Sequence, residues 1–398
     1  MIPAPPAELR VLFDVPLASR TTLRLGGPAT ALCEVPSPEA ALLAAEWARR
    51  VGLPLAVLGG GSNTLVGDAG FAGLVLVPTA CRLTVVDPPR PAAASDAPAA
   101  EAVRLRAEAG LSWDEVVAFA VRRGLGGIAA LSGIPGRVGA APVQNIGAYG
   151  EQLADVFVSA DVVDLGTGRV EVWDAARARF GYRDSAWKRS APGAFFISAV
   201  TLQLRRQTHG GARYPELRKA LTAGGVDPDA APLAVLRAAV LQVRRRKAMV
   251  LDPLEPDSRS VGSFFVNPIV DDAVADGLGQ RVPPLLSGDP VEMPRWPAGP
   301  GRSKLSAAWL LELAGWRRGD GCDGPAIGAV ASDHGPGAVG LSRRHVLALV
   351  HRGGGSATQL ARFADDVAEG VRRQTGVTLE REPVWLGGGP DQERKAGG

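Results

Sequence analysis

The segment from residue 124 to 150, GLGGIAALSGIPGRVGAAPVQNIGAYG, constrains the fold of this chain most. It holds eight glycines in 27 residues and a single charged side chain, Arg137. Glycine costs backbone entropy on folding, so dense glycine is useful mainly where φ is positive or the backbone approaches another group closely. We predict a backbone laid against a large flat ligand, with N–H groups facing phosphates and with Gln144, Asn145 and Tyr149 at the edges of a heterocycle. A glycine-rich packed turn is the alternative that composition leaves open.

A second glycine-rich segment, GGGSN at 59–63, follows the apolar residues 55–58. It does not fit the dinucleotide pattern G-x-G-x-x-G, because Thr64 stands at the third glycine position and β-like residues follow. It also lacks the Gly-Lys-Ser/Thr of a P-loop. What remains is either a turn that holds a pyrophosphate through backbone N–H groups or an ordinary tight turn. Two such loops in one chain favour two sides of one extended cofactor.

Composition excludes several classes of protein. The 398 residues are enough for two or three domains, and 44 basic residues against 41 acidic ones give a net charge of +3, without the basic stripe of a nucleic-acid binder. The cysteines are far apart and the four histidines have no metal-ligand spacing, so we expect a reducing cytoplasm, no disulfide framework and no metal site. No apolar stretch reaches membrane-spanning length, and the N-terminus has no signal-peptide pattern.

The spacing of apolar residues, together with capping residues, glycines and prolines at element ends, predicts a mixture of helices and strands. Helices are expected at 37–52, 112–123, 233–243, 304–314 and 357–374, and strands at 55–58, 64–66, 74–77, 103–107, 195–204 and 346–350, with a strand pair over 156–172. The Pro/Ala-rich segment 87–102 is expected to be a mobile surface insertion and 287–303 a second loose stretch. Because no regular βαβ rhythm is present, an α+β fold is expected and not a doubly wound sheet.

Three polar residues can carry chemistry, each with an ordinary alternative. Arg183, in FGYRDSAWKR, is either a structural ion pair with Asp184 or another acid, or a guanidinium facing developing negative charge. Ser263 lies between a glycine and two phenylalanines, where a plain turn hydroxyl is common, and no histidine partner for a triad is nearby. Glu382 lies near the chain end, where most glutamates are solvated.

Seven segments, taken in order, resemble the UDP-N-acetylenolpyruvoylglucosamine reductase family. They are TTLRLGGPA at 21–29, LGGGSNTLVGDAGFAGLVL at 58–76, SGIPGRVGAAPVQNIGAYG at 132–150, FGYRDSAWKR at 180–189, GSFFVNP at 262–268, KLSAAWLLELAG at 304–315 and LEREPVWLG at 379–387. The resemblance covers roughly residues 18–387. Collinear order makes it far more specific than any single motif.

The resemblance implies an α+β fold made of a vanillyl-alcohol-oxidase/PCMH-type FAD-binding domain of two α+β subdomains and a smaller α+β C-terminal substrate domain. It divides the chain into an N-terminal extension (1–17), the FAD-binding domain (18–205, with the mobile insertion 87–102), a connecting segment with a substrate loop and a helix (206–250), a substrate-binding domain (251–387, with the insertion 287–303) and a disordered tail (388–398).

The implied reaction belongs to peptidoglycan synthesis. Non-covalent FAD is reduced by NADPH, and hydride from flavin N5 then goes to C3 of the enolpyruvyl group of UDP-N-acetylglucosamine enolpyruvate, which gives UDP-N-acetylmuramate. The partner is this small molecule, with no nucleic acid and no membrane insertion, and the enzyme is expected to be cytoplasmic and monomeric. NADPH is not distinguished from NADH by the sequence.

The resemblance also carries over residue roles. Arg183 and Glu382 match the catalytic arginine and glutamate at the substrate carboxylate, and Ser263 matches the serine that delivers a proton to C2. Substrate contacts are implied for Tyr182, Tyr214, Lys247, Asn267 and His345. FAD contacts are implied for Gly59, Gly60, Gly61, Ser62, Asn63, Ser132, Gly133, Ile134, Pro135, Gly136, Gly139, Ala140, Gln144, Asn145, Gly147, Ala148, Tyr149, Gly150 and Arg244.

One departure leaves the glutamate ambiguous. The family usually reads LEPEVRFIG where this chain has LEREPVWLG, so Glu380 stands only two residues from Glu382, and on a strand both would point to the same side. Two other functions stay open: another FAD-dependent oxidoreductase of the same superfamily, and a non-catalytic protein that binds flavin or a UDP-sugar.

Overall fold

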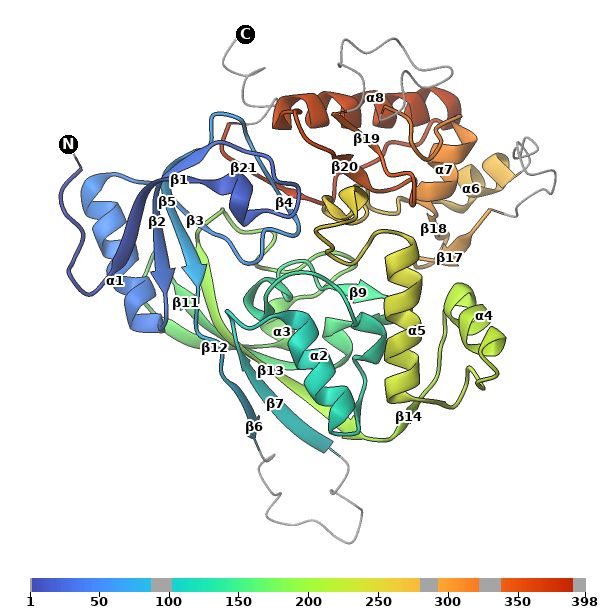
Figure 1. The fold of residues 1–398 in the computed structure, drawn as a ribbon, viewed down its shortest axis with the longest axis horizontal. Helices are drawn as coiled ribbons and strands as arrows, with labels where there is room; N and C mark the ends of the chain where they lie inside the picture. The colour runs from blue at the N-terminus through green and yellow to red at the C-terminus, as the bar shows by residue number, and fades with distance from the viewer. Residues whose placement is uncertain (1, 87–101, 280–292, 322–337, 389–398) are drawn as a thin grey trace, which may run out of the picture. The chain divides into compact units, whose positions relative to one another are not determined.

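The structure, a computed structural model, describes residues 2–86, 102–279, 293–321 and 338–388 (Figure 1). The chain forms two compact units, each built from separated segments. The first comprises Met1–Val15, Pro28–Gly61 and Phe71–Val250, and the second Pro16–Gly27, Ser62–Gly70 and Leu251–Gly398. The predicted insertion 87–102 and tail 388–398 lie outside the described residues, apart from Ala102 and Gly388.

One sheet of the first unit has four strands in the order β1-β2-β5-β3. These are β1 (Arg10–Pro16), β2 (Pro28–Val35), β5 (Phe71–Pro78) and β3 (Leu55–Val57). Helix α1 (Pro38–Val51) connects β2 to β3 and lies along this sheet (Figure 1). The Ser37 side chain accepts from the N–H of Ala40 at its start, and Gly52 ends it with a φ of 74°. The helix predicted at 37–52 is therefore confirmed, and its alanine-rich face buries Trp47 in the core.

The second sheet of this unit has the order β12-β11-β13-β7-β6, with β8 also beside β13. Its strands are β6 (Leu83–Val86), β7 (Ala102–Glu108), β8 (Leu125–Gly126), β11 (Phe157–Asp164), β12 (Val170–Asp174) and β13 (Phe195–Arg206). The predicted strands at 103–107 and 195–204 and the predicted pair over 156–172 are confirmed. Helix α2 (Trp113–Arg122) starts at the predicted capping box of Ser112 and Glu115, and α3 (Ala175–Ala178) follows β12.

Two helices complete the first unit. Helix α5 (Leu233–Arg246) buries Leu233, Leu236, Val240 and Val243, the face predicted from their spacing. Helix α4 (Pro215–Ala223) was not predicted; it packs against α5 through Leu217 and Leu221. Short pairs β9–β10 (Gly147–Ala148, Glu151–Gln152) and β14–β15 (His209–Gly210, Ala231–Pro232) and the turns η3 (Ala129–Leu131), η4 (Val138–Ala140) and η5 (Leu153–Asp155) connect these elements.

In its described residues, the second unit combines three helices with three small sheets. The helices are α6 (Asp272–Gly279), α7 (Ala307–Leu313) and α8 (Ala357–Thr375), with 3-10 turns η1 (Leu17–Arg20) and η6 (Pro256–Ser258). The sheets are β16 (Ile269–Asp271) with β18 (Arg302–Leu305) and β17 (Arg295–Pro297), β19 (Val339–Leu341) with β20 (Leu349–His351), and β4 (Thr64–Val66) with β21 (Val384–Leu386).

Three expectations for this unit differ from the structure. The stretch 287–303 was expected to be loose, yet in its described part residues 295–297 and 302–303 belong to strands, because each pairs with a neighbour despite the Pro and Gly around it. The strand expected at 346–350 is observed three residues later, at Leu349–His351, since the preceding residues form a turn. The helix expected at 357–374 is confirmed as α8. The one expected at 304–314 is observed as α7 but begins at Ala307, because Lys304 and Leu305 belong to strand β18 and Ser306 is the N-cap.

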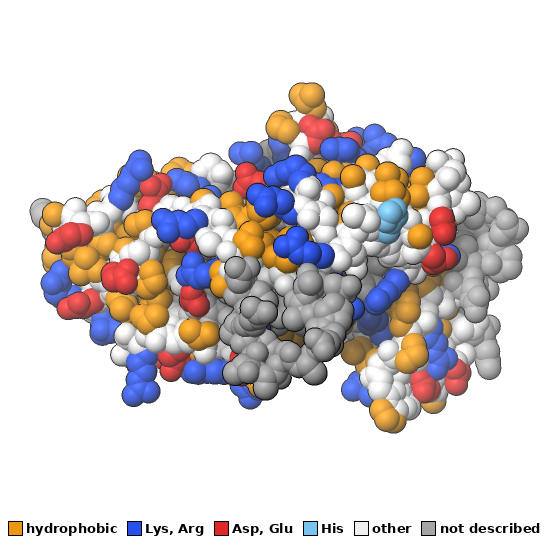
Figure 2. Space-filling model, turned by 90° about the horizontal axis from the view of Figure 1, so that it is seen from below, with side chains coloured by type: hydrophobic (Ala, Val, Ile, Leu, Met, Phe, Trp, Pro, Cys, Tyr) orange, Lys and Arg blue, Asp and Glu red, His pale blue; other side chains and the backbone are white. Residues whose placement is uncertain are grey.

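The distribution of charged side chains on the surface agrees with the small net charge. On the face drawn in Figure 2, basic side chains of the described residues are interspersed with acidic and apolar ones. No helix in the described part of the chain combines the length and the apolar composition needed to cross a bilayer.

The N-terminus of α8 is held by a carboxylate from a distant segment of the same unit. Asp68 accepts hydrogen bonds from the backbone N–H of Ala357 at 2.7 Å and of Thr358 at 2.9 Å, and from the Thr358 hydroxyl at 2.6 Å. The hydroxyl of Ser356 accepts a hydrogen bond from the N–H of Gln359. The N–H groups that a helix start leaves without an intrahelical partner are thus satisfied. This contact ties the segment that contains β4 to the longest helix of the unit.

We predict that Asp68→Ala lowers the free energy of unfolding by about 2 kcal/mol, the upper range for a lost helix cap. Burial raises the pKa of Asp68, but the hydrogen bonds from Thr358 and Ala357 outweigh it, so the pKa lies below its usual value. The stabilisation is therefore complete above the unfolded-state pKa of about 4 and is lost as the pH falls through the lower folded-state pKa. Thermal unfolding of both proteins at pH 7 and at pH 3 measures this difference, which should narrow in acid.

Asp174→Ala is the matched control, because Asp174 caps the four-residue helix α3 through the N–H of Arg177. Its unfolding temperature should change less. Equal shifts for the two variants would contradict the role given to Asp68.

Candidate functional site

The two glycine-rich loops meet backbone to backbone in the first unit. A Cβ atom on Gly60 would lie 2.8 Å from the Cα of Gly136, and one on Gly59 would lie 2.8 Å from the Cβ of Ala140. Gly61, Gly133 and Gly136 have φ of 62°, 72° and 122°. No larger residue fits at Gly60 without moving the opposite backbone. The close approach observed is between the two loops, and the predicted contact of this backbone with a flat ligand stays a prediction.

Asp114 holds the second loop at Gly133. Its Oδ1 accepts from the N–H of Gly133 at 2.6 Å, and its two oxygens accept from the guanidinium of Arg237 at 2.6 and 2.7 Å. Burial raises the pKa of Asp114, but the bonds from Arg237 and Gly133 outweigh this effect and keep the pKa below its usual value. The loop is thereby fixed to α2 and α5 by a charged, two-pronged contact.

A cationic and aromatic cluster lies beside this loop. The Nε atom of Arg244 is buried and has no hydrogen-bond partner among the described residues, while its Nη2 donates to the carbonyl of Met249 at 2.8 Å. Burial raises the pKa of Tyr149 to about 12, although the nearby Arg244 opposes the shift. The rings of Tyr149 and Tyr214 meet edge to face with centroids 5.5 Å apart. The Nε of Arg244 can therefore still donate a hydrogen bond to an acceptor.

Lys247 is paired with an acid that the sequence analysis did not single out. Its Nζ donates to Oε2 of Glu216, in the first turn of α4, whose N-cap residue is Tyr214. Burial and then the Glu216 charge raise the pKa of Tyr214. The structure thus brings together Tyr149, Tyr214, Arg244 and Lys247, four residues predicted from the resemblance, around Glu216.

Arg183 is held in a strained turn at the same loop. Its φ is 55°, and its Nη2 donates to the carbonyl of Gly147 at 2.8 Å. Asp184, the acid considered as an ion-pair partner of Arg183, pairs with Arg189. A positive φ at a non-glycine residue persists only where surrounding contacts enforce it. The guanidinium of Arg183 also lies over the ring of Tyr182, at 5.8 Å from its centroid.

Asn145 holds the turn that contains Arg183 through hydrogen bonds of its side chain. Its amide nitrogen donates to the carbonyl of Gly181 at 3.0 Å, and its oxygen accepts from the N–H of Ala154 at 2.9 Å. Its side chain is thus engaged within the protein, as is the hydroxyl of Ser132, which donates to Ala129 at 2.6 Å. Their expected contacts with a cofactor stay predictions, whereas their contacts within the loop are observed.

In the second unit, the segments that carry Ser263 and Glu382 run antiparallel beside each other. The N–H of Glu382 donates to the carbonyl of Phe264 at 2.8 Å, and that of Val266 donates to the carbonyl of Glu380 at 2.9 Å. Glu382 is therefore paired with the residue next to Ser263 and is partly buried, whereas Glu380 is exposed. Asn63 completes this arrangement: its amide donates to the carbonyl of Glu382 at 3.2 Å.

Asn267 and His345 lie elsewhere in this unit. The side-chain oxygen of Asn267 accepts from the N–H of Ala307 at 2.9 Å, at the start of α7. His345 lies in a turn whose backbone N–H groups, from Arg344 and His345, donate to the hydroxyl of Ser342.

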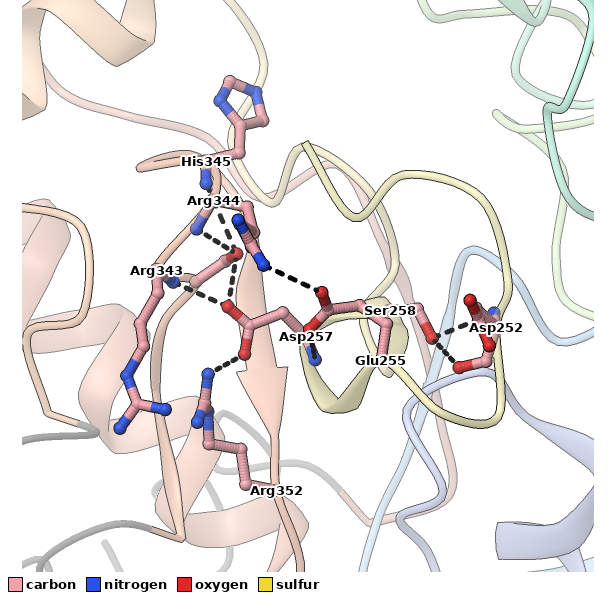
Figure 3. A network of polar contacts seen from close by, with 9 residues as sticks. Asp252, Glu255, Asp257, Ser258, Arg343, Arg344, His345 and Arg352 are labelled. Atoms are coloured by element: carbon pink, nitrogen blue, oxygen red, sulfur yellow. Dashed lines mark hydrogen bonds and ion pairs between the residues drawn. The ribbon is translucent and has the colours of Figure 1, made fainter. Parts of the chain in front are cut away.

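The turn that carries His345 rests on Asp257, which is 1% exposed (Figure 3). The Asp257 carboxylate accepts from the hydroxyl of Ser342 at 2.9 Å and from the N–H of Arg343 at 2.7 Å, and it pairs with Arg352. The imidazole of His345 points away from this network in Figure 3. Asp257 lies six residues before Ser263, so the same stretch of chain anchors the turn and leads into the serine.

Sequence reasoning missed Asp114, Glu216 and Asp257. Asp114 carried a weak signal, because it lies within the capping box that was recognised. Glu216 is two residues from Tyr214, but nothing in the sequence pairs it with a lysine 31 residues later. Asp257 gave no sequence signal that distinguishes a buried carboxylate from a loop acid.

Both halves of the chain match known protein families. Residues 29–173 match a family described as FAD binding domain, and residues 252–386 match one described as UDP-N-acetylenolpyruvoylglucosamine reductase, C-terminal domain. The UDP-N-acetylenolpyruvoylglucosamine reductase of Thermobifida fusca is 43% identical over 375 residues, which cover 94% of this chain and 97% of that protein. The protein of the same name from Saccharopolyspora erythraea is 42% identical over 373 residues, with coverage of 93% and 94%.

A solved structure agrees at the level of the fold. The crystal structure of UDP-N-acetylenolpyruvylglucosamine reductase from Thermus caldophilus superposes with a TM-score of 0.56 at 21% identity, over 95% of this chain and 99% of that one. The α+β fold with an FAD-binding domain followed by a C-terminal domain is confirmed. From its sequence similarity over nearly its whole length, the chain belongs to the UDP-N-acetylenolpyruvoylglucosamine reductase family.

Proposed function

We propose that this chain reduces UDP-N-acetylglucosamine enolpyruvate to UDP-N-acetylmuramate with electrons from NADPH, through non-covalently bound FAD, in peptidoglycan precursor synthesis. The observation that carries the proposal is the backbone contact between the two glycine-rich loops, at Gly60 and Gly136, in a member of this family. The expected cellular place is the cytoplasm, and the expected state is a monomer.

The residues present fit FAD. The segments 59–63 and 132–136 are rich in glycine, so their backbone N–H groups other than that of Pro135 are little covered by side chains of their own, and the buried Nε of Arg244 lacks an acceptor among the described residues. Anionic groups are well held by such N–H clusters. These residues would hold the diphosphate and the isoalloxazine, together with Gly139, Ala140, Gln144 and the segment Gly147–Gly150. When bound, FAD supplies the hydride for the substrate.

Arg183 would oppose the charge that develops on the substrate. Reduction at C3 leaves carbanion-like charge at C2 that spreads into the carboxylate as an enolate. A fixed cation aimed at such charge is typically worth about 3–4 kcal/mol in the transition state. The strained turn and the bond from Arg183 to the Gly147 carbonyl support this role, because they hold the guanidinium in one orientation before substrate arrives.

Ser263 would donate the proton to C2, and Glu382 would assist. A serine hydroxyl is a poor acid in water, so the basicity of the enolate and a positioned proton relay must compensate. A bare carboxylate would repel the enolate, so Glu382 fits only if it is protonated or passes a proton on. The pairing of Glu382 with Phe264 and the exposure of Glu380 favour Glu382 as the active-site glutamate.

The remaining residues would bind the nucleotide part of the substrate. Tyr214 and Lys247 suit the uridine and the diphosphate, and Tyr182, Asn267 and His345 are assigned to the substrate through the resemblance. We retain the predicted division into an FAD-binding domain (18–205), a connecting segment (206–250) and a substrate-binding domain (251–387). The family matches at 29–173 and 252–386 support this division.

Anaerobic stopped-flow absorbance near 450 nm tests the proposed function. NADPH should bleach the flavin, and UDP-N-acetylglucosamine enolpyruvate should then restore its colour. Bleaching without recolouring would replace the proposal by another flavin-dependent oxidoreductase. A colourless protein that FAD does not reconstitute would reject the assignment of both loops.

Ser263→Ala is predicted to separate the two half-reactions. Bleaching by NADPH should proceed at nearly the wild-type rate, because Ser263 donates its proton only to the substrate. Recolouring by the enolpyruvyl substrate should slow by about a thousandfold, within the usual range for loss of a positioned acid. Ser260→Ala, on the same segment, serves as control and should leave recolouring intact. Slow bleaching with normal recolouring in Ser263→Ala would contradict the assigned role.

Asp114→Asn is predicted to weaken FAD binding by about tenfold, because it removes a charged acceptor from the N–H of Gly133 and from Arg237. Titration of the apoprotein with FAD, followed by flavin fluorescence, gives the dissociation constant. Glu115→Gln is the matched control: Glu115 is in the same helical turn and bonds only the N–H of Ser112 in the contacts that we describe. A dissociation constant equal to wild type in Asp114→Asn would show that the loop holds its shape without this carboxylate.

A further inference from the structure

Glu216 is an acid in the neighbourhood to which the proposed function assigns a diphosphate. Its carboxylate holds the ammonium of Lys247, and the side chains of Glu216 and Lys247 are 40% and 27% exposed. Its charge also contributes to the raised pKa values of Tyr149 and Tyr214, after burial. Glu216 therefore lies near Tyr214 and holds Lys247, the two residues assigned to the nucleotide part of the substrate, and the resemblance gives it no role.

The carboxylate and a diphosphate compete for one cation. Two phosphates bring at least two negative charges, and like charges at short range repel strongly where water is partly excluded. Lys247 can donate all its hydrogen bonds to the diphosphate only when its ion pair with Glu216 has opened. The free energy gained when Lys247 binds the diphosphate is therefore reduced by the free energy needed to break the Lys247–Glu216 pair.

Glu216 has a second place where its charge is stabilised. It lies in the first turn of the nine-residue helix α4, directly after Pro215, where the helix dipole favours a negative charge. At 40% exposure the carboxylate also reaches water. After the ion pair has opened, both groups still have favourable interactions. The Glu216 carboxylate is stabilised by the start of α4 and by water, and the Lys247 ammonium binds the phosphates.

We propose that Glu216 is the counter-ion that Lys247 exchanges for the diphosphate of a uridine diphosphate group, and that this exchange sets the affinity of the site. The inference rests on the proposed function. Because Tyr214 is the N-cap residue of α4 and its ring contacts Tyr149, the exchange also acts on the helix start that carries Tyr214. Glu216 tunes the affinity of the site in this scheme and takes no part in proton or hydride transfer.

The test uses the flavin-loaded protein and UDP alone as the probe, with calorimetric titration at 25 and 250 mM NaCl. Glu216→Gln should lower the dissociation constant of UDP by about three- to tenfold at low salt, because it removes the competing charge and frees Lys247. The gain should shrink at high salt, where screening weakens the original competition. Glu216→Asp, which keeps the charge, should bind UDP within about twofold of wild type.

Lys247→Gln should raise the dissociation constant of UDP about tenfold, and adding Glu216→Gln to it should bring a smaller gain than in the wild-type background. Asp229→Asn is the control for α4, because Asp229 accepts from Arg218 of this helix at 3.0 Å without contacting Lys247 in the described structure. It should leave UDP affinity unchanged.

Three results would overturn the inference. Weaker or unchanged UDP binding in Glu216→Gln, with Lys247→Gln impaired, would mean that Glu216 orients the lysine. An equal gain in Asp229→Asn would trace the effect to the packing of α4. Unchanged binding in Lys247→Gln would reject the diphosphate assignment of Lys247. Failure of the wild-type protein to bind UDP or to pass electrons from NADPH to the enolpyruvyl substrate would instead reject the proposed function.

Discussion

The first unit depends on one steric constraint, the contact between two stretches of bare backbone. Gly60 approaches Gly136 so closely that neither loop could carry a side chain there. The loop at 124–150 is held in two ways. Its larger apolar side chains, among them Ile128, Leu131 and Val138, are buried in the core of this unit. Charged contacts fix the backbone between them: Asp114 accepts from the N–H of Gly133, and Arg137 donates to the carbonyls of Pro78 and Gly110.

This constraint explains what could be read from the sequence. Close backbone approach needs glycine whatever the surrounding fold, so composition alone pointed to the loops at 59–63 and 124–150. Helix α1, with its cap, and helix α5, with its apolar periodicity, were equally accessible, since their signals lie within a few residues. Helix α4 was missed because its apolar face is short, with only Leu217 and Leu221 buried, and strands β17 and β18 were missed because Pro and Gly obscured them.

Long-range pairing set the limit of prediction at the candidate site. Two glutamates two residues apart on a strand share a face, so Glu380 and Glu382 could not be separated by periodicity. What distinguishes them is the register against the Ser263 segment and the return of the chain end to β4, where β21 pairs in parallel with Thr64–Val66. Such a register depends on residues more than a hundred positions apart, and no local signal encodes it.

The charged residues of the first unit differ in how completely they are paired within the chain. Asp114 and Arg237 satisfy each other through two short bonds, which suits a contact that only holds the loop. The cations assigned to ligands differ: Arg244 has a buried N–H without an acceptor in the described structure, and Lys247 has a partner that is itself 40% exposed. A buried polar group left incomplete costs stability, and a partly solvated ion pair contributes little. Both features are unfavourable or neutral for the folded chain alone, and both become favourable when an anion arrives. The partly solvated pairing of Lys247 thus differs from the two-bond contact of Asp114 with Arg237, which only holds the loop.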